Sequence, residues 1–553
     1  MERYGLAMPA DTGTTDAAAK VVDRYLRRAV LFGFSGAALV ATGDDVRLAG
    51  GYGLADRGSG RLNRSSTVFS LGSVTKPLTA TAALVLVEDG RIRLNDRLGD
   101  RLSGVPRSHA DITIEQLLSH TAGLPDATGE DFDPGERDEV LAMIFEAPAR
   151  FPPGTSYAYS NAGYSVLAAI VEDVTGEPFE TALRRLVLDP AGMTETGYRI
   201  PAWDRSDLAH FFVGDRDLGV HLDKTYPSWH IVGNGEMLST VHDLHRFIRA
   251  LASGSLLRTS TLEDAFTPRK GTYGLGWSVE VGAHGRVVGH DGASTNGVSA
   301  LLRWFRDSDT VVAILCNRDY SGGFLVHAVG PHIEELSFGG HVPMPPEVSS
   351  DRQTDAFGPQ PKTYITGAGG RLAVRRSGDA ITGRLTGQDL LDIVGGAAPD
   401  PSRDEASRAT LDMVKALIAG DGRLLLDALD GDRDRVERYR SFATDRLGTD
   451  PDAIELDGSL PVTLSVGPAT AVQLSVPGDD AEQTLRVFWR DGRLIGVGYG
   501  TRPLLDLPLV PVGPNRFVLH HLALGTTVDV SIDGDGTMTL AGSTSTVRAR
   551  PIT

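Results

Sequence analysis

The chain has 553 residues, of which 41% are hydrophobic and 23% are charged, and its formal net charge is −18 at pH 7. A chain of this length exceeds one hydrophobic core, so we expect roughly two to four domains. The acidic balance argues against nucleic acid and anionic membranes as partners. The single cysteine, Cys316, lies in an apolar run, cannot form an intrachain disulfide and is expected to be buried.

Residues 1–10 lack both the basic segment and the long apolar segment of a secretory signal. The apolar run at residues 29–41 is too short and too interrupted by glycine to span a membrane. We therefore expect a cytoplasmic protein without membrane association. Cysteine and histidine show no zinc-like spacing, so no metal or other cofactor is expected. The oligomeric state does not follow from the sequence.

The first part of the chain predicts a helix, a hairpin and a second helix. Apolar residues have helical spacing over residues 14–31. Two β-prone runs, 35–41 and 46–52, flank an Asp/Gly-rich turn that indicates a hairpin. A polar turn at residues 63–67 then leads into a loop and an apolar helix that extends to residue 87.

More helices and then a group of strands follow. Helices are predicted at residues 111–120, 164–174 and 241–252. Successive antiparallel strands are predicted at residues 273–279, 286–290, 297–305 and 310–316. An early hairpin, a group of helices and a final group of strands predict an α+β fold, in which helices pack on one antiparallel sheet.

Ser73 and Lys76 stand three residues apart at the predicted start of the second helix, so their side chains share one face of its first turn. A serine hydroxyl is a poor nucleophile at pH 7, but a buried lysine with a lowered pKa can take its proton. Backbone N–H groups at the helix start would favour an oxyanion there. Alone, the pair fits an ordinary helix start with a solvated lysine equally well.

Two further groups could complete a site. Tyr159 and Asn161 follow a tight turn and precede a helix. A lysine ammonium can lower the pKa of a nearby tyrosine, and an asparagine amide can bind lysine and substrate together. His290-Asp-Gly292 ends a predicted strand, where the glycine would let a substrate backbone approach closely. In isolation, these residues also fit a buried tyrosine with a helix cap and a plain turn.

In this order and at these separations, Ser73-Val-Thr-Lys76, Tyr159-Ser-Asn161 and His290-Asp-Gly292 resemble the three motifs of the serine β-lactamase and penicillin-binding-protein superfamily. The similarity is to the branch of class C β-lactamases, D-alanyl-D-alanine carboxypeptidases, D-aminopeptidases and related esterases. It covers roughly residues 14–340. Phrases such as Leu117-Leu-Ser-His-Thr-Ala-Gly-Leu124 and Tyr273-Gly-Leu-Gly-Trp277 are similar too.

The resemblance implies a β-lactamase/transpeptidase-like catalytic domain and acyl transfer through a serine ester. Ser73 would attack a carbonyl carbon, while Lys76 and Tyr159 would carry the serine proton to the leaving group. No metal takes part in this mechanism. The third motif departs from the Lys-Thr-Gly of class C β-lactamases, which weakens the expectation of a true β-lactamase. Asp291 within it could repel an anionic substrate terminus.

The resemblance also implies roles for the remaining site residues. The backbone N–H groups of Ser73 and Ala293 would form the oxyanion hole. Asn161 would position the lysine and the substrate. His290 would support the tyrosine or bind substrate, with Gly292 beside it.

The tail of the chain is expected to form a separate region. A Pro-rich stretch at 341–362 is predicted to be a linker between a catalytic domain at 1–340 and a β-rich accessory region at 363–553. Strand-like patterns at 363–391, 460–497 and 509–547 flank a helical pattern at 403–446. The flanking β segments resemble the lipocalin-like barrel that often follows this catalytic domain, with residues 400–503 as an α+β insertion. Two independent domains in series are the alternative.

Three functions fit the sequence. The first is a serine hydrolase that cleaves amides or esters of small peptides, in particular peptides with D-residues, or acyl esters. The second is an acyltransferase or peptide cyclase, like the penicillin-binding-protein-like thioesterases, which passes the acyl group to an amine. The third is a non-catalytic binding protein, against which the intact residue set argues. The expected partner is a small-molecule or peptide substrate.

Overall fold

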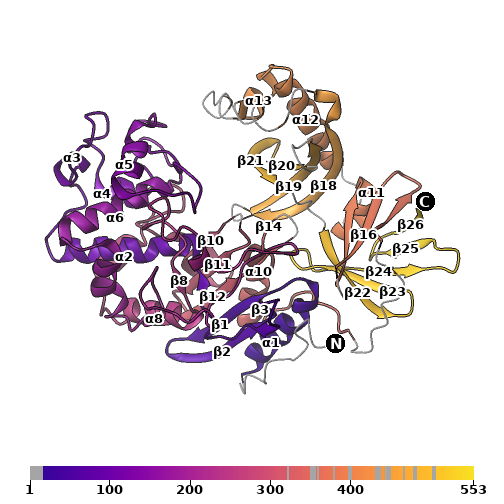
Figure 1. Cartoon of the computed structure of the whole chain (residues 1–553), viewed down its shortest axis with the longest axis horizontal. Helices are drawn as coiled ribbons and strands as arrows, with labels where there is room; N and C mark the ends of the chain where they lie inside the picture. The colour runs from indigo at the N-terminus through magenta and orange to yellow at the C-terminus, as the bar shows by residue number, and fades with distance from the viewer. Residues whose placement is uncertain are drawn as a thin grey trace.

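The computed structural model describes residues 16–552, except for residues 295, 321–322, 349–356, 358–359, 378–379, 397–400, 430–435, 437–438, 441–442, 444–446, 448–449, 465–466, 477–482 and 501–505. The expectation about a secretory signal in residues 1–10 therefore concerns a segment outside the described residues. The same holds for the first two residues of the helix predicted at 14–31. Figure 1 shows a large N-terminal body beside two smaller bodies that the rest of the chain forms.

A six-stranded antiparallel sheet organises the N-terminal body. Its strand order is β2-β1-β12-β11-β10-β9. The strands are β1 (Gly36–Thr42), β2 (Asp45–Tyr52), β9 (Ser278–Gly282), β10 (Gly285–Ala293), β11 (Ser299–Phe305) and β12 (Thr310–Cys316). The chain leaves the sheet after the hairpin of β1 and β2 and returns to it with β9, about 225 residues later. The pairing of β1 with β12 joins these two parts of the chain in one sheet. The predicted hairpin and the predicted α+β class are confirmed.

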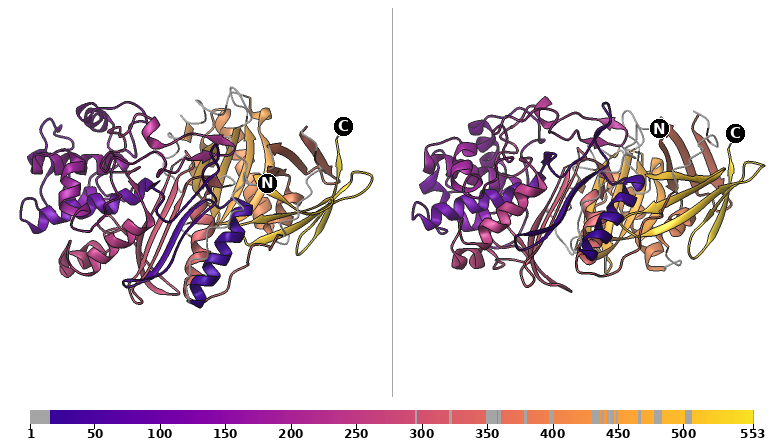
Figure 2. Two further views of the ribbon diagram at one scale, coloured as in Figure 1. Left: turned by 60° about the horizontal axis from the view of Figure 1, so that its bottom comes forward. Right: turned by 90° about the horizontal axis from the view of Figure 1, so that it is seen from below.

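The two faces of the sheet carry different helices (Figure 2). On one side of the sheet, α8 (Val241–Ala252) packs on β1 and β12, while α2 (Thr75–Glu88) lies beside it with α6 (Asn161–Thr175) packed on α2. The other face is covered by α1 (Ala17–Ala29) and α10 (Leu325–Ser337). Alternation along β12 produces the two layers, since Val311 and Ala313 belong to one apolar core and Val312 and Ile314 to the other. Cys316 is buried in the second core, as predicted.

Shorter elements connect these layers. They are η1 (Val30–Phe32), β3 (Leu54–Asp56), β4 (Arg61–Leu62), β5 (Phe69–Ser70), η2 (Gly72–Val74), α3 (Leu98–Arg101), α4 (Ile114–Leu118), α5 (Arg137–Glu146), α7 (Phe179–Leu183), η3 (Arg184–Leu188), β6 (Phe212–Val213), β7 (Arg216–Asp217), η4 (His221–Asp223), β8 (Leu238–Ser239), α9 (Thr259–Ala265), β13 (Asp319–Tyr320) and β14 (Gly323–Phe324). β5 pairs with β8, which brings the segment before Ser73 next to residues 238 and 239.

Two predicted elements are shorter than expected. The helix predicted at 111–120 is only α4. It begins late because the Thr113 side chain caps it by accepting the Gln116 N–H, and it ends early, just before His120 takes a left-handed φ of 57°. The strand predicted at 273–279 begins only at Ser278. Gly276 before it has φ 89°, and its backbone packs so tightly on α2 that a Cβ there would lie 2.3 Å from the Cβ of Ala80.

The tail contains a closed barrel of antiparallel strands. Its strands are β15 (Lys362–Thr366), β16 (Arg371–Ser377), β17 (Ala380–Thr386), β22 (Asp506–Gly513), β23 (Arg516–His521), β24 (Thr526–Ile532), β25 (Met538–Ala541) and β26 (Thr546–Pro551). β17 pairs with β22 although residues 387–505 separate them in the chain. The segment between them is therefore inserted into one barrel, an arrangement that two domains in series would not give.

The inserted segment forms a second sheet with helices on it. Its elements are α11 (Gln388–Gly395), α12 (Pro401–Ile418), α13 (Arg423–Ala428), η5 (Pro451–Ala453), β18 (Glu455–Leu464), β19 (Gly467–Val476), β20 (Gln483–Arg490) and β21 (Arg493–Gly500). The helical pattern predicted at 403–446 is confirmed for α12 and α13, while most of residues 430–449 lie outside the described part.

The tail differs from the predicted pattern after residue 387. The strand pattern predicted up to residue 391 is wrong after residue 387, because Gly387 takes φ 95° and the following residues form α11. That helix buries Leu390 and Ile393 on one face. Of the linker predicted at 341–362, residues 349–356 and 358–359 lie outside the described residues, and the domain limits stay predictions.

The barrel packs on the N-terminal body through a shared apolar core. Phe32 and Tyr320 of the N-terminal body belong to the same cluster as the barrel interior. The Leu522 N–H donates to the Tyr320 hydroxyl at 2.7 Å, and the ring centroids of Phe32 and His520 are 5.2 Å apart. Because these contacts are buried, the barrel is part of the folded whole rather than a loosely tethered appendage.

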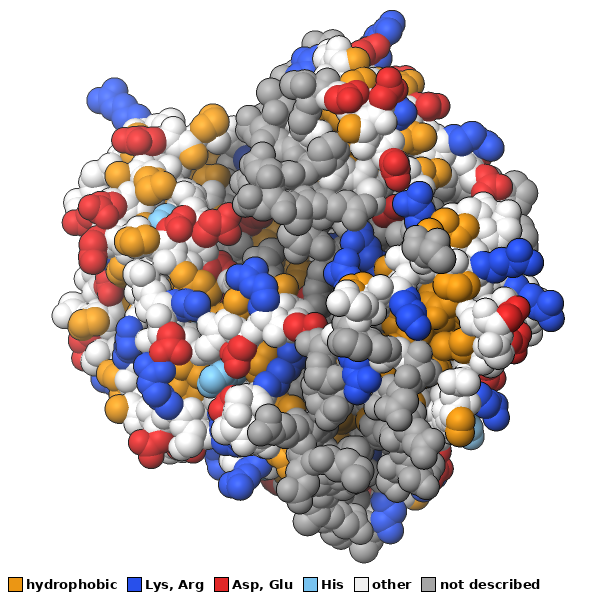
Figure 3. All heavy atoms as spheres, turned by 45° about the vertical axis from the view of Figure 1, so that its right-hand side comes forward, with side chains coloured by type: hydrophobic (Ala, Val, Ile, Leu, Met, Phe, Trp, Pro, Cys, Tyr) orange, Lys and Arg blue, Asp and Glu red, His pale blue; other side chains and the backbone are white. Residues whose placement is uncertain are grey.

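The helices and the surface charges can be compared with those of proteins that bind membranes or nucleic acid. Each helix in the described part of the chain is too short or too polar to cross a membrane. On the face drawn in Figure 3, acidic and basic side chains are interspersed over the described surface. This face therefore lacks, among its described residues, a continuous basic track of the kind that binds nucleic acid.

Candidate active site

Ser73 lies in the turn η2, directly before α2. Strand β10 presses against this turn, since a Cβ on Gly292 would lie 2.6 Å from Ser73 N and a Cβ on Gly72 would lie 2.9 Å from Ala293 N. Only glycine fits at both contact points. The backbone nitrogens of Ser73 and Ala293 are thereby brought together beside the serine hydroxyl. Gly292 makes room for the nucleophile turn, whereas the sequence interpretation assigned its space to a substrate backbone.

Lys76 is fully buried at the centre of this group. Its Nζ donates to Ser73 Oγ at 3.0 Å, to Asn161 Oδ1 at 2.6 Å and to the Asn234 carbonyl at 2.7 Å. The Tyr159 ring centroid lies 4.7 Å from Nζ. The structure thus brings the first and second sequence motifs together around one amine. Asn234, which no motif marks, was not predicted.

The protonation of Lys76 is set by its surroundings. Burial lowers the pKa of Lys76 to about 7, although the carboxylates of Asp126, Asp131, Glu236 and Asp291 act in the opposite direction. Roughly half of the lysine side chains are therefore neutral at pH 7. A neutral amine 3.0 Å from a serine hydroxyl can accept its proton.

Asn161 is the first residue of α6, and Tyr159 directly precedes the residue that caps this helix. The Ser160 hydroxyl between them accepts the Gly163 N–H at 2.9 Å and caps the helix. The Asn161 side-chain oxygen accepts from the lysine, while its Nδ2 donates to Asp126 Oδ1 at 3.3 Å. A capped helix start therefore fixes the orientation of the amide that holds Lys76.

Tyr159 stays protonated. Burial raises its pKa well above the usual range, against the opposing effect of its hydrogen bond with the Ser73 side chain. The expectation that Lys76 would favour a phenolate here is therefore wrong, because the loss of water around the buried hydroxyl disfavours its charged form and the Asp291 carboxylate adds to that effect.

His290 and Asp291 point to opposite sides of β10, since side chains alternate along a strand. His290 Nε2 lies 2.9 Å from the Tyr273 hydroxyl, and burial lowers the pKa of His290 to about 4, so the ring is neutral. Asp291 Oδ2 lies 2.7 Å from Nε2 of His327 on α10. The Asp291 carboxylate is thereby directed away from the serine, contrary to the interpretation that it meets a substrate terminus.

Aromatic side chains that were not predicted as site residues line the group, namely His120, Tyr157, Tyr164 and Tyr273. The His120 ring centroid lies 4.3 Å from that of Tyr159 and 4.6 Å from that of Tyr273. Burial holds the pKa of His120 well below its usual range, so it packs as a neutral ring. Tyr157 is 42% exposed at the rim. The family-like phrases at 117–124 and 273–277 contain two of these residues and were the available signal.

One group among the described residues could hold a metal ion, and it stands apart from the motifs. Asp56, His210 and Asp217 offer ligand atoms within 4.8 Å of one another. His210 Nδ1 lies 3.0 Å from Asp217 Oδ1, and Asp56 already accepts hydrogen bonds from Gly58 and Ser59. These contacts account for the three side chains as a surface hydrogen-bond group.

A serine next to a buried lysine, held on an antiparallel sheet between helices, defines the class of serine hydrolases with the β-lactamase/transpeptidase-like fold. The family model described as Beta-lactamase matches residues 23–329. The chain belongs to this family, and the resemblance that its three motifs carry is confirmed.

Relatives of the chain include penicillin-binding proteins and an esterase. Penicillin-binding protein 4* of Bacillus subtilis (strain 168) is 27% identical over 350 residues, which cover 59% of this chain and 76% of that protein. Esterase EstB of Burkholderia gladioli is 36% identical over 198 residues, or 32% of this chain and 50% of that protein. The octameric penicillin-binding protein homologue of Pyrococcus abyssi has a TM-score of 0.52 at 16% identity and covers 96% of this chain and 98% of its own. This last likeness concerns the fold and extends over the tail.

Proposed function

We propose that the protein cleaves small esters or amides, including peptides with D-residues, through an acyl-enzyme on Ser73. The observation that carries the proposal is the buried Lys76 amine, with a pKa of about 7, at 3.0 Å from the serine hydroxyl. A solvated lysine would be charged at neutral pH and could not act as a base. Membership of a family that includes an esterase supports the same chemistry.

Acylation begins when Ser73 Oγ attacks the substrate carbonyl carbon and its proton passes to the neutral Lys76. The new oxyanion accepts hydrogen bonds from the backbone N–H groups of Ser73 and Ala293, which the packing of β10 on η2 brings together. The bond to the leaving group then breaks. The Tyr159 hydroxyl relays the proton from the lysine to the departing oxygen or nitrogen as a neutral donor and acceptor.

The remaining side chains hold the base and the substrate. Asn161 keeps the lysine amine directed at Ser73, and its amide can also meet a polar group of the substrate. Neutral His290 orients the Tyr273 hydroxyl at one wall. The exposed Tyr157 ring at the rim offers an apolar surface to the substrate side chain.

Deacylation needs an acceptor, which is water in a hydrolase and an amine in an acyltransferase. Both acceptors attack the same ester, and in either case the neutral Lys76 can take the acceptor proton, directly or relayed by the Tyr159 hydroxyl. We propose water as the main acceptor because the relatives with a printed activity include an esterase. The partition between the two is a measurable property of the acyl-enzyme.

Intact-mass spectrometry tests the proposal directly. The protein is mixed with a panel of activated esters and D- and L-amino-acid amides, with and without an amine acceptor. We expect a transient mass increase that Ser73→Ala abolishes, whereas Ser119→Ala, a buried serine that donates to the Glu115 carbonyl, keeps it. Adduct formation at an undiminished rate in Ser73→Ala would place the nucleophile elsewhere, and amide products formed faster than acids would favour the acyltransferase.

A further inference from the structure

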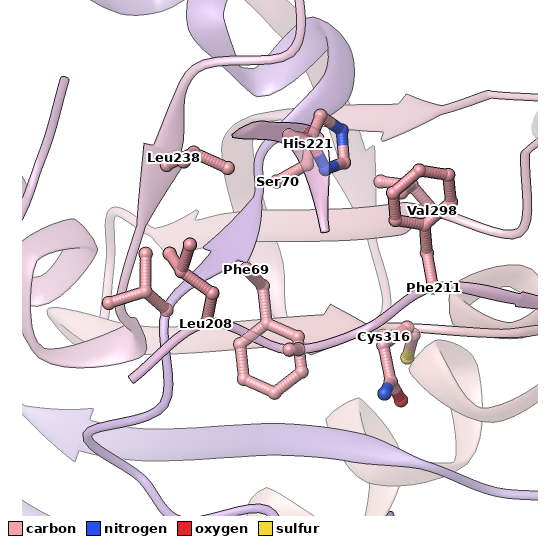
Figure 4. A pocket seen from close by; sticks show the side chains of 11 residues that line it. Phe69, Ser70, Leu208, Phe211, His221, Leu238, Val298 and Cys316 are labelled. Atoms are coloured by element: carbon pink, nitrogen blue, oxygen red, sulfur yellow. The ribbon is translucent and has the colours of Figure 1, made fainter. Parts of the chain in front are cut away.

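A buried carboxylate and imidazole lie behind the Ser73 turn and take no part in the steps above. Glu236 and His221 are each 3% exposed, and His221 Nε2 lies 2.6 Å from Glu236 Oε2. Figure 4 shows His221 beside Ser70, at one end of a cavity that both help to line. Burying two ionisable groups is costly unless they are paired and hydrogen-bonded, so their position implies a purpose near the nucleophile.

Ser70 connects this pair to the nucleophile. Its hydroxyl donates to Glu236 Oε2 at 2.8 Å and accepts the Gly72 N–H at 3.1 Å. Gly72, with φ 46°, is the first residue of the turn that contains Ser73. The carboxylate therefore fixes, through one short side chain, the backbone unit directly before the nucleophile.

The backbone around Glu236 holds the other half of the machinery. Two residues before it, the Asn234 carbonyl accepts the Lys76 amine at 2.7 Å. One residue after it, the Met237 carbonyl accepts the Leu71 N–H at 2.8 Å. One short segment thus contacts both the base and the turn of the nucleophile, and Glu236 is at its centre.

The conformation of this segment needs support. Glu236 has φ 57°, a left-handed conformation that is unfavourable for a residue with a side chain. The Tyr226 hydroxyl donates to its carbonyl at 2.8 Å. The His221 ring that meets the carboxylate packs against Phe132 and Phe211, with centroid distances of 5.4 and 4.7 Å. The strained residue is therefore held at both its backbone and its side chain.

We propose that Glu236, paired with His221, is a positioning residue that holds the Ser73 turn and the segment that binds Lys76 in one arrangement. The proposal rests on the proposed function, because it assigns the pair to the reacting serine and lysine. Glu236 touches neither the substrate nor the reacting atoms. It acts through the Ser70 hydroxyl and through the backbone of residues 234–237.

The charge of Glu236 gives this role a readout that simple support of the fold would not have. The carboxylate favours the ammonium form of Lys76 and opposes the effect of burial. The other titratable or charged groups around Lys76 are Asp126, Asp131, Asp291, His120, His290, Tyr159 and Tyr164. Removal of the Glu236 charge lowers the pKa of Lys76 directly. It also lowers the pKa of Asp131, which burial and Glu236 raise to about 7, and the additional Asp131 charge offsets part of the change at the lysine. The net result is that reaction with Ser73 begins at lower pH.

The experiment measures the rate of fluorophosphonate labelling of Ser73 against pH in the full chain, together with the melting temperature. Glu236→Gln carries no charge but keeps one acceptor oxygen, which can take the place of Oε2 between Ser70 and His221. We expect the midpoint of its pH profile of labelling to fall by roughly half a pH unit, with a less than roughly tenfold loss of rate at high pH. Ser70→Ala removes the hydroxyl that links Gly72 to Glu236, so we expect it to slow labelling about 100-fold at every pH. Glu236→Ala loses both this link and the charge, so we expect a similar loss of rate at high pH together with a lowered midpoint.

Asp243→Asn is the matched control. Asp243 lies on helix α8, is fully buried and accepts a hydrogen bond from the Thr196 hydroxyl at 2.8 Å. We expect this variant to melt earlier with an unmoved midpoint. The inference would be overturned by an unmoved midpoint in Glu236→Gln together with near wild-type labelling rates in Ser70→Ala. If Glu236→Ala does not fold, these two variants are sufficient to test the inference. A wild-type protein that is never labelled would instead overturn the proposed function itself.

Discussion

Replacement of Asn161 by aspartate would put a carboxylate where an amide oxygen now lies 2.6 Å from Lys76 Nζ. The two side chains have nearly the same shape, so the change is mainly one of charge. Opposite charges about 4 Å apart interact by about 4 kcal/mol at an effective dielectric constant near 20, equivalent to roughly three pKa units. Repulsion from Asp126, which Asn161 now contacts, reduces the effect. We expect the lysine pKa to rise by about two units, from about 7 to about 9.

The consequence is a shift of the pH profile to higher pH. The neutral fraction of Lys76 at pH 7 would fall from roughly one half to roughly 1%, so labelling of Ser73 would slow about fiftyfold and recover above about pH 10. The assay follows fluorophosphonate labelling by intact mass over a wide pH range. Asn63→Asp, which puts a carboxylate at another buried amide, is the control and should leave the midpoint unmoved. A midpoint still near 7 in Asn161→Asp, or a loss that high pH does not reverse, would refute Lys76 as the base.

Three further outcomes follow from the structure. Tyr159→Phe should lower turnover by about 10²- to 10⁴-fold without moving the pH midpoint, since the tyrosine does not titrate near neutrality; unchanged kinetics would remove it from the proton relay. Burial lowers the pKa of His521 to about 3. Unfolded His521 takes up a proton below about pH 6.5, whereas folded His521 does so only near pH 3. The contribution of neutral His521 to the free energy of unfolding is therefore fully present above about pH 6.5 and is lost as the pH falls towards 3. The melting temperature should drop on acidification, and less so in His521→Leu; an equal drop in both proteins would contradict this. A chain ending at His341 would uncover Phe32 and Tyr320. We expect it to fold with a lower melting temperature, keep labelling and change its kcat/KM ranking of substrates, whereas an insoluble product would mean that the barrel completes the core.

Much of the fold could be predicted because its elements follow local patterns. Alternating apolar residues in Thr310–Cys316 serve two cores, and a helical stripe in Val241–Ala252 faces the sheet. Errors occurred where a cap or a glycine overrode the pattern. Thr113 shortened one helix, and Gly387 ended a strand that apolar residues alone would have continued into α11.

The chemical types at the candidate site could be predicted from local order along the chain. A serine and a lysine three residues apart must share a helical face, so their contact at 3.0 Å is a local property of the chain. Tyr159, Asn161 and His290 could be singled out because each belongs to a short motif with recognisable order and separation. Together with Ser73 and Lys76, these residues indicate acyl transfer through a serine ester.

The protonation states of those groups and the contacts that hold them depend on how distant segments pack. The pKa values of Lys76 and Tyr159 depend on burial and on carboxylates far away in the chain, which no local pattern encodes. The same holds for Glu236, whose hydrogen bond to Ser70 spans 166 residues of sequence. Each position of the sequence gives its side-chain type directly, whereas solvent exclusion and long-range hydrogen bonds exist only once distant segments have packed together.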